Sequence, residues 1–446
     1  MTETAGGAEA ERLRRFEARV ADRSLRLLVI GLGYVGLPVA ATFASAGFRV
    51  TGLERNAERA AAIARGECPI AGDEPGLAAL IARTVADGHL TATSDPVVIE
   101  DADVVIVCVD TPVETNHRPE YRALRSALEV LAPNLKNGAL VIIESTLSPG
   151  TIDRVVRPAL EGNGGATLFV GHCPERVMPG RLLANLRTMS RVCGGDSPAT
   201  SRAMKALYRT IVDAELDEAS CVVAELTKTA ENTYRDVNIA FANELARVCE
   251  SAGADFLEVR ALVNKSPGRN VLMAGLGVGG HCIPKDPWLL AAAVDERTPL
   301  LLVPSARAVN DAMPLHVSRL VEEALGELGR HLSGARVAVL GFAYLAESDD
   351  ERNSPSEALV TALTACGADV RVHDPFVARF AGSIEDTLRD VDAIVIAVAH
   401  RAYESIDWIH ARTLVRTPAL IDARFVITRA LAHDAGFAFR GVGRAR

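Results

Sequence analysis

One cysteine of the chain lies at the end of a glycine-rich stretch. The stretch reads GLGVGGHCIPKDPWLL over residues 275–290, and Cys282 stands between its glycines and the charged pair that follows. Glycine-rich turns often hold phosphate groups with their backbone N–H groups, whereas a thiolate beside positive charge is a strong nucleophile. The stretch therefore suggests a nucleophile close to a bound anion.

Three other interpretations of this thiol stay open on the residues alone. A cysteine in a chain of this kind is most often a small buried hydrophobic residue. His281 precedes Cys282 and could pair with it in catalysis, although adjacent side chains rarely point to one place. A metal site would need His172 and Cys173 as further ligands, and these spacings match no standard zinc pattern. We expect no metal ion.

A second glycine-rich turn lies near the N-terminus, in LRLLVIGLGYVGLPVAATFASAGFRVTGLER at residues 25–55. Gly31, Gly33 and Gly36 follow an apolar strand at GxGxxG spacing and open a helical stretch. Glu54 ends the next strand about 20 residues later. The glycines allow a pyrophosphate to approach the helix N-terminus closely. An acid at position 54 accepts hydrogen bonds from ribose hydroxyls and repels a 2′-phosphate, so the pattern predicts NAD rather than NADP.

Two threonines follow later strands of the same predicted sheet. Thr111 comes after the apolar run 103–109 and Thr146 after the run 140–144, and a further strand is expected at 168–171. In an open parallel sheet the ligand lies at the carboxyl edge of the strands, which places both threonines near the nicotinamide. Either one could instead be an ordinary turn or cap residue. The residues expected at the cofactor are Gly31, Gly33, Tyr34, Val35, Gly36, Glu54, Arg55, Arg59, Val109, Thr111 and Thr146.

The chain becomes helical from about residue 217. Residues 219–253 are rich in Ala and Glu and contain no Pro, which predicts one long helix. Lys228 and Asn232 are four residues apart and share a face of it; such a pair is ordinarily solvated surface. A second helical stretch at 304–329 is expected to pack against the first, and together they form a natural core for a homodimer or a larger homo-oligomer.

Strands and helices alternate again from Arg336. The apolar runs RVAVL, DVRVH, DAIVIAVAH and ALIDAR, with a helix over 354–366, predict a second Rossmann-like domain. Its first turn, GFAYLAESDDERNSP, lacks the dinucleotide glycines. The fold class is therefore α/β, with two Rossmann-like parallel-sheet domains joined by a central helical segment. The expected parts are a mobile extension at 1–23, an NAD-binding domain at 24–216, the helical segment at 217–330 and a C-terminal domain at 331–446.

Composition narrows the class of partner. A net charge of −9 argues against nucleic acid, because phosphate backbones are bound by basic surfaces. No apolar run approaches the about 18 residues of a membrane span, and the N-terminus lacks the apolar core of a secretory signal. The eight cysteines include no CxxC pair, which is typical of a reduced, cytoplasmic protein.

Five motifs occur in an order that resembles a known family, the nucleotide-sugar dehydrogenases, which comprise UDP-glucose and UDP-N-acetylhexosamine 6-dehydrogenases. The resemblance covers roughly residues 25–425, and its cysteine-centred motif is the most specific part. The motifs are GLGYVGLP at 31–38, the PER of HCPERVMPG at 172–180, ELTKTAENTYRDVNIAFANELA at 225–246, GVGGHCIPKDPWLL at 277–290 and DDERNSPS at 349–356.

The resemblance implies an NAD-dependent, four-electron oxidation of a sugar C6 alcohol to a carboxylate. Loss of one hydride gives an aldehyde, which has no second hydride that leaves easily. Addition of a thiolate gives a thiohemiacetal that can expel a second hydride and leave a thioester, which water then cleaves. In this family pattern Cys282 is the nucleophile.

The resemblance also assigns the other catalytic roles. Lys228 and Asn232 match the residues that hold the alkoxide and the oxyanion, and Asp286 matches an acid that orders Lys228 and the hydrolytic water. Glu175 matches the general base of thioester hydrolysis, and Thr146 a threonine that positions a water. The residues expected at the sugar nucleotide are Glu175, Arg176, Val177, Lys228, Asn232, Arg235, Arg269, Gly275, Gly277, Gly279, Tyr344 and Arg352.

The motifs favour one branch of the family. VGGHC followed by IPKDPW, and PERVMPG, are similar to the UDP-N-acetylmannosamine and UDP-N-acetylglucosamine branch, and we favour UDP-N-acetylmannosamine as substrate. Leu345 stands where many members carry a lysine, so a nucleotide or phosphate contact in the C-terminal domain is in doubt. UDP-N-acetylglucosamine and UDP-glucose stay open as substrates. A two-electron 3-hydroxyacid dehydrogenase and a non-catalytic nucleotide-sugar sensor are the alternatives of other classes.

Overall fold

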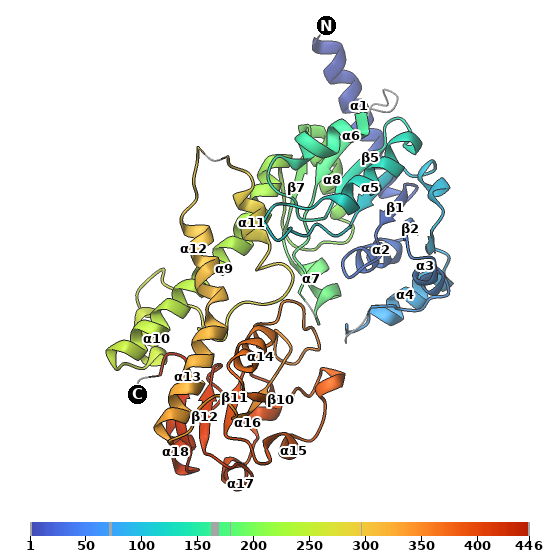
Figure 1. Cartoon of the computed structure of the whole chain (residues 1–446). Helices are drawn as coiled ribbons and strands as arrows, with labels where there is room; N and C mark the ends of the chain where they lie inside the picture. Colours follow the sequence, from blue (N-terminus) through green and yellow to red (C-terminus); the bar gives the residue numbers. More distant parts are fainter. Residues whose placement is uncertain (1, 71–73, 162–168, 179, 296, 445–446) are drawn as a thin grey trace. The chain divides into compact units, whose positions relative to one another are not determined.

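The computed structural model describes residues 2–70, 74–161, 169–178, 180–295 and 297–444, with side chains from residue 9 onward. The chain forms two compact units, each built on a sheet of its own (Figure 1). Unit 1 comprises Met1–Glu231 and Trp288–Arg297, and unit 2 comprises Asn232–Pro287 and Thr298–Arg446.

The sheet of unit 1 has eight strands in the order β3-β2-β1-β4-β5-β6-β7-β8, and every neighbouring pair is parallel except β6 and β7. Residues of β1, β4 and β5 alternate between two apolar clusters. A strand that is buried on both faces is apolar throughout, which is why these runs stand out in the sequence. The strands are β1 (Arg26–Ile30), β2 (Arg49–Leu53), β3 (Leu90–Thr93), β4 (Val104–Val107), β5 (Leu140–Ile143), β6 (Phe169–His172), β7 (Arg191–Gly195) and β8 (Leu216–Ser220).

Three strands of this sheet were not predicted. The edge strands β3 and β8 have the sequences LTAT and LDEAS and carry exposed polar residues, and β7 ends in two glycines. Such segments carry little of the apolar signal of a central strand. The strands expected at 103–109 and 140–144 are confirmed. The strand expected at 168–171 is found as β6, with its first residue, Leu168, outside the described residues.

Helices pack on this sheet and include one at the N-terminus. The first 23 residues, for which no element was expected, contain helix α1; Arg19 on it forms an ion pair with Asp103 at 2.6 Å, and Val20 is buried. The mobility expected of this segment stays a prediction. The helices of unit 1 are α1 (Thr2–Ala21), α2 (Gly36–Ser45), α3 (Ala57–Ala64), α4 (Leu77–Ala86), α5 (Arg122–Leu131), α6 (Arg157–Glu161), α7 (Leu182–Thr188) and α8 (Pro198–Tyr208), with short turns η1 (Pro96–Ile99), η2 (Ala132–Asn134) and η3 (Ile152–Val156).

The long central helix was predicted within two residues. Helix α9 runs over Cys221–Ala252, and the limit between the two units falls inside it, after Glu231. The second stretch, expected over 304–329, is two helices, α12 (Leu302–Asp311) and α13 (Met313–Glu327). The break lies at Ala312, just before Pro314, because proline is tolerated in the first turn of a helix and not inside one.

Unit 2 carries a five-stranded parallel sheet in the order β10-β9-β11-β12-β13. The expected strands and the helix at 354–366 are confirmed, whereas β13 was not predicted. The strands are β9 (Arg336–Leu340), β10 (Asp369–His373), β11 (Ala393–Ile396), β12 (Ala419–Asp422) and β13 (Ala438–Gly441). The other helices are α10 (Phe256–Val263), α14 (Pro355–Ala365), α15 (Ile384–Leu388), α16 (Arg401–Glu404), α17 (Trp408–Leu414) and α18 (Arg429–Asp434), with turn η4 (Ala378–Phe380), and α11 (Asp286–Ala291) begins in unit 2 and ends in unit 1.

The fold class is as predicted: α/β, with two Rossmann-like parallel-strand sheets and a central helix between them in the chain. Among the described residues, no helix combines the length and the apolar character that a membrane crossing requires.

Candidate active site

The three glycines after β1 differ in what surrounds them. A Cβ on Gly36 would lie 1.9 Å from the carbonyl oxygen of Gly31, and a Cβ on Gly31 would lie 2.6 Å from the carbonyl oxygen of Cys108. Gly31 also has φ +85°, a conformation that suits glycine. A Cβ on Gly33, in contrast, would meet nothing within 4 Å. The turn is therefore closed by Gly31 and Gly36 and open at Gly33, which fits the approach of a pyrophosphate there.

Glu54 follows β2 and faces this turn. Its carboxylate accepts hydrogen bonds from the backbone N–H of Leu32 and of Asn56, each at 3.0 Å. A carboxylate has about four acceptor positions, so two bonded positions leave acceptors for ribose hydroxyls. Asn56 in turn caps α3 through the N–H of Arg59. Glu54 is thus held at the place where a dinucleotide ribose is bound in this fold.

The other predicted cofactor residues surround the turn. Val35 precedes the first residue of α2, Arg55 is exposed, and the guanidinium of Arg59 donates to the carbonyl oxygen of Pro69 at 3.4 Å. The hydroxyl of Tyr34 donates to the carboxylate of Glu74, a link that the sequence did not reveal.

The two threonines are brought together at the carboxyl edge of the sheet. The hydroxyl of Thr111 donates to the carbonyl oxygen of Thr146 at 2.7 Å, and both residues are buried. The carbonyl oxygen of Val109 accepts from the hydroxyl of Ser145 at 2.6 Å. The loops after β4 and β5 are therefore joined, as the positions of these residues at strand ends predicted.

Glu175 and Lys228 also lie together in unit 1. The ammonium group of Lys228 donates to the carbonyl oxygen of Glu175 at 2.6 Å and lies 3.8 Å from its carboxylate. The carboxylate accepts from the N–H of Val177 at 2.5 Å. Both side chains are buried, with 8% of Glu175 and 6% of Lys228 exposed. A carboxylate and an ammonium group therefore lie at one place, where they could serve as a base and a cation.

The neighbours of Glu175 have roles inside the protein. The guanidinium of Arg176, predicted at the sugar, forms an ion pair with Glu231 and donates to the carbonyl oxygen of Ser190 at 2.6 Å. Burial lowers the pKa of His172 to about 4, and the charge of Lys228 contributes, so this imidazole is neutral at pH 7. Among the described residues, no group of three or more His, Cys, Asp or Glu side chains is arranged to hold a metal ion.

Cys282 heads a tight turn in unit 2. Its side chain is exposed, and its carbonyl oxygen accepts from the N–H of Lys285 at 3.1 Å and of Asp286 at 2.9 Å. Asp286 is fully buried; its carboxylate accepts from the side-chain amide of Asn232 at 2.6 Å and lies 3.1 Å from the ammonium group of Lys285. Asn232 and Asp286 are thus brought together as predicted residues. Lys285 was missed, although its place between Cys282 and Asp286 was a signal.

The glycines before Cys282 lie in close packing with other parts of unit 2. A Cβ on Gly279 would lie 2.6 Å from the Cβ of Tyr344, and a Cβ on Gly280 would lie 2.9 Å from its ring. A Cβ on Gly277 would lie 2.9 Å from the carbonyl oxygen of Asn310, and a Cβ on Gly275 would lie 2.6 Å from the guanidinium of Arg424. These glycines permit close packing within unit 2, and sugar contact through their backbone stays a prediction.

The same packing joins the cysteine loop to the first turn of the second sheet. The N–H of Gly280 donates to the carbonyl oxygen of Arg352 at 2.9 Å. The guanidinium of Arg352 forms an ion pair with Asp350 at 2.5 Å, which raises the pKa of Arg352. Burial raises the pKa of Tyr344, and the nearby charges of Asp350 and Cys282 add to this effect. Tyr344 and Arg352 thus lie against the loop that ends in Cys282, and their contact with the substrate stays a prediction.

Two predicted substrate residues have few contacts in the described structure. Arg235 is exposed on α9, and Arg269 is exposed with its guanidinium donating to the carbonyl oxygen of Pro267 at 2.7 Å. A further pair was missed: in unit 1 the ring of Trp288 stacks on that of His117, with centroids 3.8 Å apart and planes at 9°. This stack fixes α11 on the loop that follows Thr111. Trp288 belongs to the IPKDPW motif, but nothing in the sequence indicated His117 as its partner.

Family models match nearly the whole length of the folded chain. Residues 25–212 match the NAD binding domain of the UDP-glucose/GDP-mannose dehydrogenase family, residues 222–312 its central domain and residues 338–429 its UDP binding domain. The chain belongs to the UDP-glucose/GDP-mannose dehydrogenase family. It is an NAD-dependent UDP-sugar dehydrogenase, and NAD is its cofactor as predicted.

Individual relatives cover almost all of the chain. It is 37% identical to the UDP-N-acetyl-D-mannosamine dehydrogenase of Pyrococcus horikoshii, over 94% of this chain and 99% of the relative, and the solved structure of that enzyme superposes with a TM-score of 0.88. An NDP-N-acetyl-D-galactosaminuronic acid dehydrogenase from Methanosarcina mazei is 36% identical, with 97% and 98% of the two chains covered and a TM-score of 0.86. A UDP-glucose dehydrogenase from Pyrobaculum islandicum is 28% identical, with 94% and 98% covered and a TM-score of 0.82.

Proposed function

We propose that this enzyme oxidises the C6 alcohol of a UDP-N-acetylhexosamine, with UDP-N-acetylmannosamine favoured, to the uronic acid in two hydride transfers. The observation that carries the proposal is the turn of unit 2 in which an exposed Cys282 heads a buried Asp286 held by Asn232 and Lys285. A two-electron alcohol dehydrogenase has no use for a thiol there. A four-electron enzyme needs one, because the aldehyde must be converted into a species that can lose a second hydride.

The residues divide the reaction between them. NAD, when bound, accepts the hydride in each of the two steps. Lys228, an ammonium group held by Glu175, stabilises the alkoxide of the first step and the oxyanion of the thiohemiacetal. The thiolate of Cys282 adds to the aldehyde carbon, and loss of hydride from that carbon leaves a thioester. Glu175 takes a proton from the water that attacks the thioester, which releases the carboxylate and returns Cys282 as thiolate.

Overall, one alcohol, one water and two NAD give one carboxylate, two NADH and three protons. This stoichiometry distinguishes the proposed reaction from that of a two-electron 3-hydroxyacid dehydrogenase, which forms one NADH per substrate. The measurement is the moles of NADH formed per mole of limiting UDP-sugar at completion. A ratio of two supports the proposal, and a ratio of one contradicts it.

Variants test the individual roles. We expect Cys282→Ser to bind UDP-sugar with unchanged affinity while steady NADH production falls to background. Lys228→Ala slows both hydride steps. Glu175→Gln gives a burst of NADH and then stalls as a thioester, seen as the mass of the sugar nucleotide added to the intact protein. If Cys282→Ser turns over at the rate of the unchanged enzyme, the thioester route is excluded. If the unchanged protein has no activity and Cys282→Ser does not alter sugar binding, a non-catalytic nucleotide-sugar sensor is favoured instead.

The choice of sugar is supported by motifs and by one relative. GGHCIPKDPW and PERVMPG favour the N-acetylhexosamine branch, and the relative from Pyrococcus horikoshii is named for UDP-N-acetyl-D-mannosamine. UDP-N-acetylglucosamine and UDP-glucose are the alternative substrates, and the Pyrobaculum islandicum relative is named for UDP-glucose. A panel of these three UDP-sugars and UDP-N-acetylgalactosamine, read by NADH formation, decides the substrate by the highest kcat/KM.

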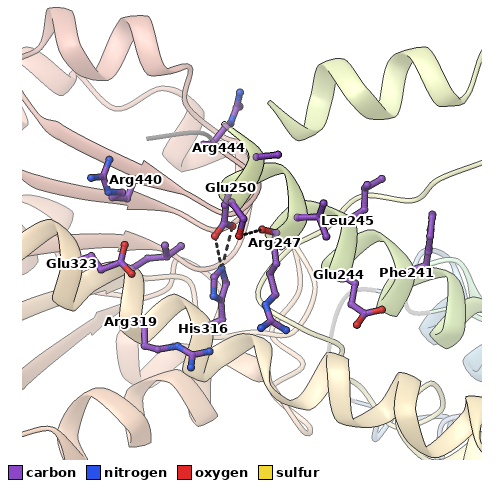
Figure 2. A pocket seen from close by; sticks show the side chains of 14 residues that line it. Phe241, Glu244, Leu245, Arg247, Glu250, His316, Arg319, Glu323, Arg440 and Arg444 are labelled. Carbon is purple, nitrogen blue, oxygen red and sulfur yellow. Dashed lines mark hydrogen bonds and ion pairs between the residues drawn. The ribbon is translucent and has the colours of Figure 1, made fainter. Parts of the chain in front are cut away.

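A homodimer is the proposed assembly, and the surface of α9 supports it. Tyr234, Phe241 and Val248 recur every seven residues and are 71%, 55% and 59% exposed, so they form one apolar stripe along the helix. Figure 2 shows Phe241 and Leu245 at a cavity of about 1140 Å³ whose walls include α9 and α13. None of the predicted site residues lines this cavity. A second copy would cover the stripe.

The dimer has a direct test in solution. We expect Phe241→Glu to halve the mass measured by light scattering, whereas Ile409→Glu, at a residue of α17 that is 69% exposed, leaves it unchanged. Equal masses for both variants would contradict this interface. A cytoplasmic location is proposed from the cysteine usage, since the described cysteines form no disulfide bond with one another.

A further inference from the structure

The loop after β5, residues 144–151, is the segment that carries Thr146. Its start is fixed by a buried ion pair, in which Glu144 accepts from the guanidinium of Arg191 at 2.9 Å and from the hydroxyl of Tyr208 at 2.5 Å. Its middle is fixed by the bond from Thr111 to the carbonyl oxygen of Thr146. These contacts hold the loop on the sheet, and they involve no residue of α9.

The end of the same loop is bound by a side chain of α9. One carboxylate oxygen of Glu225 accepts from the N–H of Gly150 at 2.6 Å, and the other accepts from the N–H of Ile152 at 2.8 Å. Ile152 is the first residue of η3 and Gly150 lies two residues before it, at the start of the helical segment formed by η3 and α6, where backbone donors have no partner within the helix. Glu225 is fully buried and acts as an N-cap supplied by another element.

Glu225 is also a neighbour of the predicted active-site lysine. Lys228 follows it by three residues on α9, and residues at that spacing lie side by side on a helix. Gly150 is four residues after Thr146. One carboxylate therefore connects the turn of α9 that carries Lys228 with the loop that carries Thr146. The family pattern assigned no role to it.

We propose that Glu225 is a positioning residue, which sets the distance between Lys228 and Thr146 by binding the backbone at Gly150 and Ile152. The proposal depends on the proposed function, in which Lys228 holds the developing oxyanion and Thr146 a water. Misplacement of catalytic groups by about 1 Å can reduce a rate by about 100-fold. A carboxylate with two short bonds to a loop backbone is suited to prevent such a displacement.

Protonation of Glu225 gives the proposal a pH dependence. Burial raises the pKa of Glu225 to about 7, against the hydrogen bonds from Ile152 and Gly150, which lower it; the charge of Asp153 raises it further. The other titratable or charged groups around it are Cys221 and Lys228 on α9, Arg154 on η3 and Tyr121 before α5. A protonated carboxyl group keeps one acceptor oxygen and turns the other into a donor, so one of the two backbone bonds is lost below pH 7.

The effect of pH on the stability contribution of Glu225 is opposite to its effect on positioning. Because the pKa of Glu225 is raised in the folded protein, its contribution to folding is greatest below its unfolded pKa of about 4.3 and is lost as the pH rises through about 7. Positioning needs the ionised form and improves over the same range. A rise in kcat between pH 6 and 8 without a rise in stability is therefore the signature of a positioning role.

The test compares Glu225→Gln with Glu225→Ala and with the unchanged enzyme. Gln keeps one acceptor oxygen and mimics the protonated form, so we expect kcat to fall by about 10-fold at pH 8, with KM for NAD and for UDP-sugar within about threefold. The step in kcat that the unchanged enzyme shows near pH 7 is lost in Glu225→Gln. Ala keeps neither acceptor, and we expect a loss of about 100-fold. The matched control is Glu218→Gln on β8, an exposed residue that forms ion pairs with Arg202 and Lys205.

Each outcome decides the proposal. A kcat for Glu225→Gln equal to that of the unchanged enzyme, or a step near pH 7 that persists in it, overturns the positioning role. A fall in kcat that is accompanied by weaker NAD binding and a lower Tm overturns it too, because that combination indicates a general loss of folded structure. If Glu225→Ala does not fold, amide hydrogen exchange at Gly150 and Ile152 in Glu225→Gln supplies a second measure, and unchanged protection there contradicts the proposal. If the unchanged enzyme oxidises no UDP-sugar, the proposed function fails instead, and the exchange measurement still reports on the loop.

Discussion

The two Rossmann-like sheets begin in the same way and treat their first turn differently. In unit 1, β1 is joined to α2 by residues 31–35; in unit 2, β9 is joined to α14 by residues 341–354. The short turn is closed by its own backbone, since a Cβ on Gly36 would lie 1.9 Å from the carbonyl oxygen of Gly31. The long turn packs instead on the loop that ends in Cys282, through Tyr344 and Arg352.

The acid after the second strand shows the same contrast. Glu54 follows β2 and accepts two backbone hydrogen bonds, from Leu32 and Asn56. Asp374 follows β10 at the corresponding place and is fully buried. It accepts four backbone hydrogen bonds, from Phe342, Ala343, Phe376 and Val377, and a fifth bond from the Nε2 of His400. The Nδ1 of His400 accepts from the N–H of Glu347, so its Nε2 carries the proton and donates.

The difference explains how one fold serves two nucleotides. In unit 1 the acid keeps acceptors for a ribose and the glycine turn keeps room for a pyrophosphate. In unit 2 the acceptors of the acid are used to hold its own long turn, and that turn brings Tyr344 and Arg352 to the cysteine loop. A short open turn therefore suits a cofactor that binds and leaves, and a long anchored turn suits the placement of substrate residues.

The largest expected effect comes from closing the turn of unit 1. Gly36→Ala places a methyl group on the carbonyl oxygen of Gly31, so the backbone must shift. We expect the Kd for NAD to rise by at least about 100-fold, which corresponds to about 3 kcal/mol. Isothermal titration with NAD measures it.

Gly33→Ala is the sharper variant of the same experiment. Its Cβ meets no protein atom within 4 Å, so Tm is expected to stay within about 2 °C while the Kd for NAD rises by about 10-fold, because the methyl group fills the space of the pyrophosphate. Unchanged NAD affinity in Gly33→Ala would show that the open side of the turn is not the phosphate site.

A second pair of variants removes the charge of one acid at a time, Asp374 or Glu54. Asp374→Asn leaves backbone donors facing an amide NH₂, and we expect a loss of stability on the order of 3 kcal/mol with the Kd for NAD unchanged. Glu54→Gln is expected to weaken NAD by about 10-fold and to change stability by about 1 kcal/mol or less. Urea unfolding and NAD titration of both variants give the four values. A stable Asp374→Asn would contradict the contrast between an anchored and an open turn.

How much of this contrast is readable from the sequence depends on the type of signal. The apolar strands, the glycine spacing, Glu54 and the cysteine motif were all found, because burial on both faces and glycine-only geometry constrain residue types strongly. The anchoring by Asp374 was not, since an acid after a strand looks the same whether its acceptors face a ligand or its own turn. The stack of His117 on Trp288 and the cap by Glu225 were missed for a similar reason. Each depends on a partner far away in the chain, and no local pattern encodes it.

Low pH should remove the contribution of Asp374 to the stability of the protein. Burial favours the neutral acid, but the hydrogen bond from His400 and those from the backbone outweigh it and hold the pKa of Asp374 below its usual value. A lowered pKa means that the contribution to stability is complete above the unfolded pKa of about 3.9 and is lost as the pH falls through the folded value. We expect the difference in urea midpoint between the unchanged protein and Asp374→Asn to be constant from pH 7 to 5 and to shrink below about pH 4. A difference that is the same at pH 7 and pH 3 would show that packing, and not charge, anchors the long turn.

The smallest expected effect tests the long turn as a substrate element. Leu345 is 43% exposed next to Tyr344, at the position where the family pattern described above has a lysine. A cation at an exposed position contributes up to about 1 kcal/mol to binding an anion, so Leu345→Lys is expected to lower KM for the UDP-sugar by up to about fivefold. KM for NAD and kcat stay the same, and the gain disappears in 0.5 M salt because exposed charges are screened. Leu345→Met is the neutral control. If Leu345→Lys leaves KM for the UDP-sugar unchanged at low salt, position 345 does not face the diphosphate, and the anchored turn serves the substrate through Tyr344 and Arg352 instead.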